Sequence, residues 1–415
     1  MDLVFEAGAA ADAKGKEGGI GLCAGLITDG TKTLDKIQLA EALADLASGL
    51  SSGASTDQLT ISLTSLTKNL GPTLDLWAAS VLEPGLRADE FERAQKRSLA
   101  NLKRLKGSPE ALAARVGGSI AYGENHPYAK ITTETSLSAV TVADCQALHK
   151  DWIKPAGAKL YVVGDVTRAQ IEELVGGRLA TWKGAGKKMP AVAKGALRKG
   201  KIFLIDVPGA PQSVVSLVHL GPPRKAKDYF DTRLMSAILG GGFSSRINMN
   251  LREDKGWTYG ARGGFGYTRI GSVFTAGGGI VAEHTAESIL EIYKEIAGVK
   301  TAEVKDEELK REKDGTVLGL PAMFATGGAV AGAYRQLIYF GLPLDYFDSY
   351  VQKVQAVSKA SVLKAGAAYL KPADVRIVVV GDAKTLEPKL TALFQDKAVG
   401  PGTIVKLDYD GKVKN

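Results

Sequence analysis

The sequence of 415 residues is poor in the side chains that usually build metal sites and disulfide frameworks, with only four histidines and two cysteines. Cys23 and Cys145 can form at most one bridge, and no Cys-x-x-Cys or Cys/His spacing indicates structural zinc. No two histidines lie four residues apart, the spacing that places two ligands on one helix face. We therefore expect hydrophobic cores, and not disulfides, to hold the fold.

Long apolar runs are also absent. No stretch approaches the roughly 18–20 apolar residues that span a bilayer, and Met1-Asp2 is not followed by a basic and then an apolar segment. As written, the sequence thus predicts neither a membrane span nor an export signal. The net charge of +8 is spread over the chain, so a nucleic-acid partner is not expected. The phosphate-binding pattern G-x-x-x-x-G-K-[ST] is missing.

The chain contains an internal repeat. Residues 139–165 and 356–382 are identical at 10 of 27 positions without a gap, at an offset of 356 − 139 = 217. Both copies carry a Ser or Thr that can cap a helix, then Lys-Pro-Ala, then an apolar strand ending in Gly-Asp. The repeat predicts two homologous structural halves.

Helical stretches alternate with short β-branched strands in each half, which predicts an α+β fold of two homologous domains, each a mainly antiparallel sheet covered by helices. Gly, Ala and Lys replace the apolar periodicity in residues 186–200, which we expect to be a linker. The predicted domains are therefore 1–185 and 201–415. The first copy starts late relative to the second. Either an N-terminal strand was removed from it, which we expect, or this copy never had one.

Three segments resemble the pitrilysin/insulinase-type zinc peptidases. The run AGAAADAKGKEGGIGLCAGLITDGT is similar to the family's segment around its zinc helix. The run NHPYAKITTETSLSAVTVADCQALHKDWIKPAGAKLYVVGD is similar to its HP…G-D segment, and GGGFSSRINMNLREDKGWTYGARGGF to its second-domain signature. The resemblance extends over nearly the whole chain and implies paired α+β domains.

The family's inverted zinc motif, His-x-x-Glu-His, is degenerate here. Counting back from Gly30-Thr31, the positions of the two ligands and the base hold Gly21, Gly25 and Ala24, and the distal glutamate ligand falls near Asn101. None of these side chains can replace a histidine or carboxylate on Zn²⁺. We expect no metal and no other cofactor in this chain, and no activation of water by it alone.

The second half keeps a pair that the resemblance assigns to chemistry. Arg252 and Tyr259 stand at the spacing of the family's Arg/Tyr pair, which contributes to substrate and transition-state binding. Alone, each would be interpreted as a solvated or half-buried residue. Gly256 can cap the helix that carries Arg252, so that Tyr259 begins the next strand and both side chains can project to one side.

The segment Gly240-Gly241-Gly242-Phe243 has two open interpretations. The resemblance implies a flexible glycine-rich, substrate-binding segment, whereas close packing of a helix would need the same small residues.

Together these features predict the non-catalytic subunit of a heterodimeric zinc endopeptidase. In this hypothesis a homologous partner carries His-x-x-Glu-His and Zn²⁺, the substrate is a peptide or an unfolded protein, and no nucleic acid or membrane span is involved. The alternative is a catalytically dead structural or peptide-binding paralogue. A periplasmic location of a bacterial protein would fit the late start of the first copy, with the cytoplasm as the alternative.

Overall fold

The computed structural model describes residues 1–414, which form two compact units. Unit 1 comprises residues 1–104, 130–191 and 327–331, and unit 2 comprises residues 105–129, 192–326 and 332–414. The expected linker, residues 186–200, contains no helix or strand.

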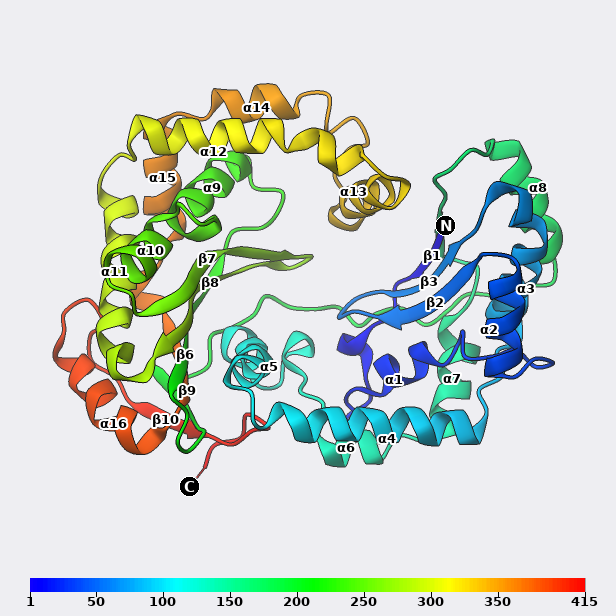
Figure 1. Cartoon of the computed structure of the whole chain (residues 1–415), viewed down its shortest axis with the longest axis horizontal. Helices are drawn as coiled ribbons and strands as arrows, with labels where there is room; N and C mark the ends of the chain where they lie inside the picture. The colour runs from blue at the N-terminus through cyan, green and yellow to red at the C-terminus, as the bar shows by residue number, and fades with distance from the viewer. Residues whose placement is uncertain (415) are drawn as a thin grey trace. The chain divides into compact units, whose positions relative to one another are not determined.

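Unit 1 contains a four-stranded antiparallel sheet in the order β2-β3-β1-β4 (Figure 1). Its strands are β1 (Asp2–Phe5), β2 (Gly49–Ala54), β3 (Leu59–Thr64) and β4 (Lys159–Tyr161). The helices of this part of the chain are α1 (Gly19–Gly25), α2 (Lys36–Asp45), α3 (Leu70–Leu82), α4 (Ala88–Leu105), α6 (Glu134–Ser138), α7 (Val142–Trp152) and α8 (Arg168–Arg178).

Unit 2 contains a six-stranded mixed sheet in the order β10-β5-β9-β6-β8-β7. The strands are β5 (Ile202–Asp206), β6 (Gln212–Gly221), β7 (Thr258–Thr268), β8 (Gly271–Val281), β9 (Arg376–Gly381) and β10 (Ile404–Leu407). Its helices include α5 (Pro109–Tyr122), α9 (Tyr229–Ser236), α10 (Arg246–Asn248), α11 (Thr285–Thr301), α12 (Asp306–Leu318), α14 (Tyr350–Ala356), α15 (Lys359–Tyr369) and α16 (Ala383–Ala392), with α13 (Gly327–Phe340) divided between the units.

The predicted α+β class is confirmed, and the element bounds repeat as the sequence does. Helix α7 maps onto α15 at both ends, since 142 + 217 = 359 and 152 + 217 = 369. The strand order β2-β3-β1-β4 corresponds to β7-β8-β6-β9. Within residues 1–414, the sheet of unit 1 has no counterpart of β5 or β10, which pair in parallel and make the sheet of unit 2 mixed.

Helix α5 belongs to the first sequence copy but packs on β6 and β9 of unit 2. Ser108 caps its first turn, Pro109 occupies the first position, and Gly123 follows its end at φ +92°. The helix is held at its C-terminal end because Ala196 and Arg198 donate backbone hydrogen bonds to Tyr122 and Ile120. α5 therefore belongs to the first half by its place in the sequence repeat but to unit 2 by its contacts.

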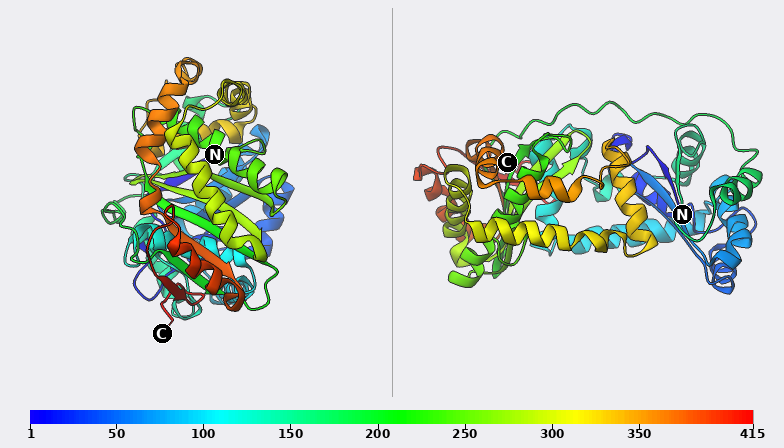
Figure 2. Two further views of the ribbon diagram at one scale, coloured as in Figure 1. Left: turned by 90° about the vertical axis from the view of Figure 1, so that its left-hand side faces the viewer. Right: turned by 90° about the horizontal axis from the view of Figure 1, so that it is seen from above.

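The two faces of the unit 2 sheet have different neighbours. Val215 and Leu217 of β6 join a large apolar core with α9 and α11, and the yellow-green α11 lies over the strands in Figure 2. Because side chains alternate along a strand, Val214, Ser216 and Val218 point to the opposite face, beside α5. A separate apolar core, which includes Trp77 of α3, fills unit 1.

No single helix in residues 1–414 is long and apolar enough to cross a membrane. One pair, residues 306–324 and 327–340, meets those requirements of length and composition only together and is bent by 112°.

A buried histidine in β6 predicts loss of stability in acid. His219 is fully buried, stacks on Phe274 at 4.7 Å, and burial lowers its pKa. Below about pH 6.5 the His219 imidazole is protonated in the unfolded chain but stays neutral in the native chain. The free energy of unfolding therefore falls by up to about 1.4 kcal/mol per pH unit below that pH. Urea unfolding from pH 8 to pH 5 should show a smaller acid slope in His219→Phe. Burial also lowers the pKa of His149, so some dependence of stability on pH should remain in His219→Phe. Equal slopes in the unchanged chain and in His219→Phe would contradict the role given to His219.

Candidate functional site

The helix that aligns with the family's zinc helix, α1, has no ligand side chains. Gly21 is exposed, Gly25 is partly exposed and Ala24 is fully buried, while Asn101 lies exposed on α4. Within residues 1–414, no group of three or more His, Cys, Asp or Glu side chains could hold a metal ion. The residues present at these positions do not fit zinc.

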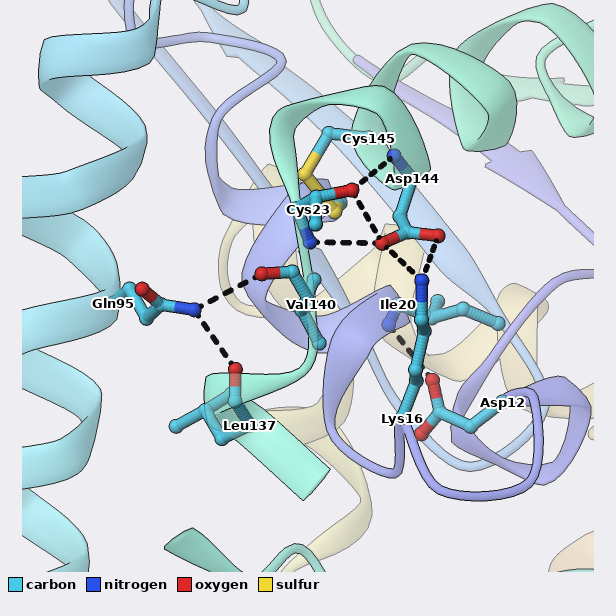
Figure 3. Close-up of a disulfide and its surroundings, with 10 residues drawn as sticks. Asp12, Lys16, Ile20, Cys23, Gln95, Leu137, Val140, Asp144 and Cys145 are labelled. Carbon is cyan, nitrogen blue, oxygen red and sulfur yellow. Dashed lines mark hydrogen bonds and ion pairs between the residues drawn. A yellow bond between two sulfur atoms is a disulfide. The ribbon is translucent and has the colours of Figure 1, made fainter. Parts of the chain in front are cut away.

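A disulfide crosslinks this degenerate helix. Cys23 of α1 is bonded to Cys145 of α7, both cysteines being 2% exposed (Figure 3). The sequence allows at most one bridge, and the structure forms it between these two cysteines. Sequence spacing could not reveal the bridge, because 122 residues separate the cysteines and only the packing of α1 on α7 brings their Cα atoms to 4.8 Å.

Polar contacts fix α1 around the bridge (Figure 3). The Asp12 carboxylate accepts hydrogen bonds from the Gly18 and Ile20 N–H groups, both at 2.8 Å, and so satisfies donors at the start of α1. Lys16 forms an ion pair of 2.7 Å with Asp144 of α7. Burial would raise the pKa of Asp144, but the hydrogen bonds from Lys16 and Thr141 lower it. α1 is thus fixed in unit 1 without a metal.

Along the chain, Arg252 precedes and Tyr259 follows Gly256, the glycine at which a helical segment ends. The π-helical segment η5 (Met249–Asp254) carries Arg252, and Gly256 at φ +69° donates its N–H to the Arg252 carbonyl at 3.1 Å. A glycine is required here because the left-handed conformation strains other residues. Tyr259 follows in β7 at an irregularity of the β7–β8 ladder between Thr258 and Ala261.

Both side chains of the pair are accessible. Tyr259 is 87% exposed, and the exposed Arg252 guanidinium lies 4.9 Å from the ring centroid of Phe243 and 3.1 Å from the carboxylate of Glu253. Phe243 is itself 51% exposed. The structure therefore brings Arg252 against Phe243, one of the predicted substrate-binding residues. Within residues 1–414, no hydrogen bond and no cation–π contact joins Arg252 to Tyr259.

The glycines before Phe243 have different surroundings. Gly240 is buried in the π-helical segment η4 (Ala237–Gly241), and a Cβ there would lie 2.2 Å from the Gly263 nitrogen of β7. Close packing explains Gly240. A Cβ added at Gly242 would meet no atom of the described chain within 4 Å, and Gly241 is exposed. Close packing therefore does not explain these two glycines, and among the three glycines the substrate-binding interpretation is left for these two alone.

Asn248 makes buried hydrogen bonds beside the Phe243 segment that the sequence did not reveal. It is fully buried, donates from Nδ2 to the Phe243 carbonyl at 2.7 Å, and accepts from the Ala261 N–H at 3.1 Å and from Arg262 Nη1 at 3.0 Å. It therefore ties the Phe243 segment to β7. An asparagine in an amphipathic helix gives no signal of this kind, because its partners are distant in sequence or lie on the backbone.

A groove of about 1320 Å³ lies within unit 2, on the face of the sheet that α5 partly covers. Its floor is formed by β6, β7 and β8, with α5 and α12 along the sides. Small residues predominate; they include Ala114, Gly117, Gly264, Gly277 and Gly279. At Gly277, φ is +150° and a Cβ would lie 1.9 Å from the Val215 carbonyl oxygen, so only glycine fits. A wide groove with few projecting side chains can admit the main chain of an extended polypeptide.

The ion pair between Arg246 and Glu308 ties α12 to α10 beside this groove. Arg246 donates to both carboxylate oxygens of Glu308 at 2.7 Å, and the two side chains are 20% and 12% exposed. Burial would raise the pKa of Glu308, but hydrogen bonds from Arg246 and the Lys305 N–H lower it. The bidentate geometry fixes the helix more firmly than a single contact would.

The fold and the degenerate metal site together define a zinc-peptidase architecture without its zinc ligands. Residues 1–133 match the model of the insulinase family, peptidase family M16, and residues 139–316 match the model described as the peptidase M16 inactive domain. The chain belongs to peptidase family M16.

Curated relatives agree with this assignment. The chain is 21% identical over 397 residues to the non-peptidase homolog YmxG of Helicobacter pylori, covering 92% of this chain and 89% of that protein. It is 24% identical over 240 residues to an uncharacterized zinc protease of Mycobacterium leprae, covering 56% of this chain and 53% of that protein. The matched region thus spans about half the length of the mycobacterial relative.

Solved structures share the fold. The peptidase M16 inactive domain from Pseudomonas fluorescens is 25% identical with a TM-score of 0.84, covering 92% of both chains. The periplasmic protease PqqL from Escherichia coli is 16% identical with a TM-score of 0.78, covering 92% of this chain and 42% of that one. The prediction of no zinc in this chain agrees with its match to an inactive domain and with its missing ligands.

Proposed function

We propose that this chain is the non-catalytic subunit of a heterodimeric zinc metalloendopeptidase, and that it supplies Arg252 and Tyr259 to the zinc site of a homologous partner. The observation that carries the proposal is the contrast between two places: the zinc positions hold Gly21, Ala24 and Gly25, while Arg252 and Tyr259 are both present and exposed. A tyrosine 87% exposed at a strand irregularity has little packing role to explain it.

The chemistry of the pair suits peptide-bond hydrolysis. A guanidinium can hold a peptide carbonyl, and a phenol can donate a hydrogen bond to the oxyanion that forms when water attacks the scissile bond. Neither group can activate the water. This role therefore needs a partner with His-x-x-Glu-His and Zn²⁺, which provides the nucleophile.

The disulfide supports a periplasmic location within this proposal. Bridges such as Cys23–Cys145 persist in oxidising compartments, which include the bacterial periplasm, and are rare in the cytosol. PqqL, a protein of the same fold, is described as a periplasmic protease.

Mixing experiments test the proposal directly. The purified chain should cleave no peptide alone, and it should raise cleavage by a homologous chain from the same organism that carries His-x-x-Glu-His. Cleavage and co-elution from a sizing column are measured at several subunit ratios, and maximal activity is expected at equal amounts. No association and no gain of activity with any such homologue would refute the heterodimer.

The groove of unit 2 favours a second candidate, a peptide-holding paralogue without a catalytic partner. Filling the groove with Ala114→Trp on α5 should weaken binding of fluorescein-labelled, unfolded β-casein at least tenfold, because the indole would occupy the space beside the small residues of the floor. Fluorescence anisotropy measures the affinity. Ala368→Trp, at an exposed position of α15, is the matched control. Equal affinities of the two variants would exclude the groove as the binding site.

A further inference from the structure

A second cavity of unit 2, of about 720 Å³, lies near the start of β5. It is lined by Lys201, Tyr293 of α11, Arg376 of β9, and the loop 397–403 that leads into β10. None of these residues belongs to the Arg252/Tyr259 region or to the groove beside α5.

Lys201 is a buried cation with little compensation. It is 7% exposed, its Nζ lies 3.5 Å from the Ala373 carbonyl oxygen, and the centroid of the Tyr293 ring is 6.0 Å away. No carboxylate lies within 4.0 Å of its ammonium in the part of the chain that the structure describes. Burial lowers the pKa of Lys201, the Arg376 charge lowers it further, and Asp374 raises it in part. A buried ammonium is costly unless an anion or several hydrogen bonds offset its lost hydration.

Two further groups converge on the same cavity. Tyr293 is 3% exposed, and its hydroxyl has no hydrogen-bond partner among residues 1–414. Burial raises the pKa of Tyr293, so its hydroxyl remains a donor near neutral pH. Arg376 donates to the carbonyl oxygens of Arg198 and Asp374 but has no acidic side chain as an ion-pair partner in the described chain.

The loop over the cavity is built to approach Lys201 closely. Gly400 has a φ of +73°, and a Cβ on Gly402 would lie 2.5 Å from the Lys201 Cβ. Glycine at both positions lets the loop turn and pack on the lysine stem. The loop contributes another cation, Lys397, and the described residues that line the cavity include no acidic side chain.

We propose that this cavity binds a small oxyanion, a phosphate or carboxylate group, held by Lys201 and Arg376 as cationic partners and by the Tyr293 hydroxyl as a neutral donor. Such an anion would complete the ion pairing of two cations and give the unpaired phenol an acceptor. The site is independent of the proposed peptidase role.

Isothermal titration calorimetry of the full chain tests the site, with inorganic phosphate and acetate as separate probes at constant ionic strength. We expect saturable one-site binding of at least one probe, and the tighter probe identifies the oxyanion class. Lys201→Met keeps the alkyl stem and should weaken binding at least tenfold. Lys384→Met, at an exposed position of α16, should bind as the unchanged chain does.

Tyr293→Phe keeps the test decisive if Lys201→Met does not fold. It removes one unpartnered hydroxyl, should leave the circular dichroism spectrum unchanged, and should weaken binding severalfold. Absence of saturable binding of both probes to the unchanged chain overturns the proposal, as does unaltered affinity in a folded Lys201→Met or, failing that, in Tyr293→Phe.

Discussion

Tyr259→Phe is expected to lower kcat of the proposed heterodimer by on the order of 10²–10³, the usual effect of losing one oxyanion donor, which is the role proposed for Tyr259. The substitution removes only a hydroxyl from a side chain that is 87% exposed, so folding and association should survive. Steady-state cleavage of a peptide at matched subunit stoichiometry measures the effect, and gel filtration checks that the heterodimer remains intact.

Arg252→Ala belongs to the same prediction. It should raise KM as well as lower kcat, because the guanidinium is expected to position the substrate before the reaction. The matched control is Arg168→Ala on α8, whose side chain is 91% exposed and pairs with Glu172. Unchanged kcat/KM in both Tyr259→Phe and Arg252→Ala would favour the structural or peptide-binding paralogue over the non-catalytic subunit.

Removing the Cys23–Cys145 disulfide should cost about 2–5 kcal/mol in the free energy of unfolding, since it closes a long loop in the unfolded chain. The double variant Cys23→Ala/Cys145→Ala leaves no buried thiol, and both sites are small and fully enclosed. Urea denaturation, followed by a probe in unit 1, measures the loss.

Reduction supplies the control for this prediction. A reductant should destabilise the unchanged chain by a similar amount and leave the double alanine variant unaffected. If the reduced and oxidised forms of the unchanged chain unfold at the same urea concentration, the bridge makes no contribution to stability.

The repeat could be found in the sequence because it is carried by local signals. The Thr141 and Ser358 caps, the Lys-Pro-Ala segments and the apolar strands all repeat at one offset, and α7 and α15 have the bounds that this offset requires. The degenerate zinc positions were equally readable, because a ligand motif of five consecutive residues is local. Position Gly256 was predicted as a helix cap for the same reason, and its φ of +69° agrees.

Features made by distant residues could not be predicted in this way. The Cys23–Cys145 bridge and the contacts of Asn248 depend on how helices pack. Lys201 is adjacent to an apolar strand in sequence, where a lysine is normally exposed to solvent. It is enclosed by the loop 397–403, α11 and residues 372–376, which are all distant from it in sequence. In the sequence, Gly240 fitted close packing and substrate binding equally well. The structure explains it by packing, because a Cβ at this position would collide with the Gly263 backbone.

The placement of α5 constrains the order in which the chain can fold. This helix, residues 109–122, packs on β6 and on β9, residues 376–381, so part of its partner surface is synthesised near the very end of translation. Until β9 is made, the part of α5 that packs on β9 lacks its native partner. Contacts between such distant segments carry a high loop-closure cost and slow folding. Expression of residues 201–415 alone would also lack this helix, so the natural cut between the sequence copies would not yield an intact second unit.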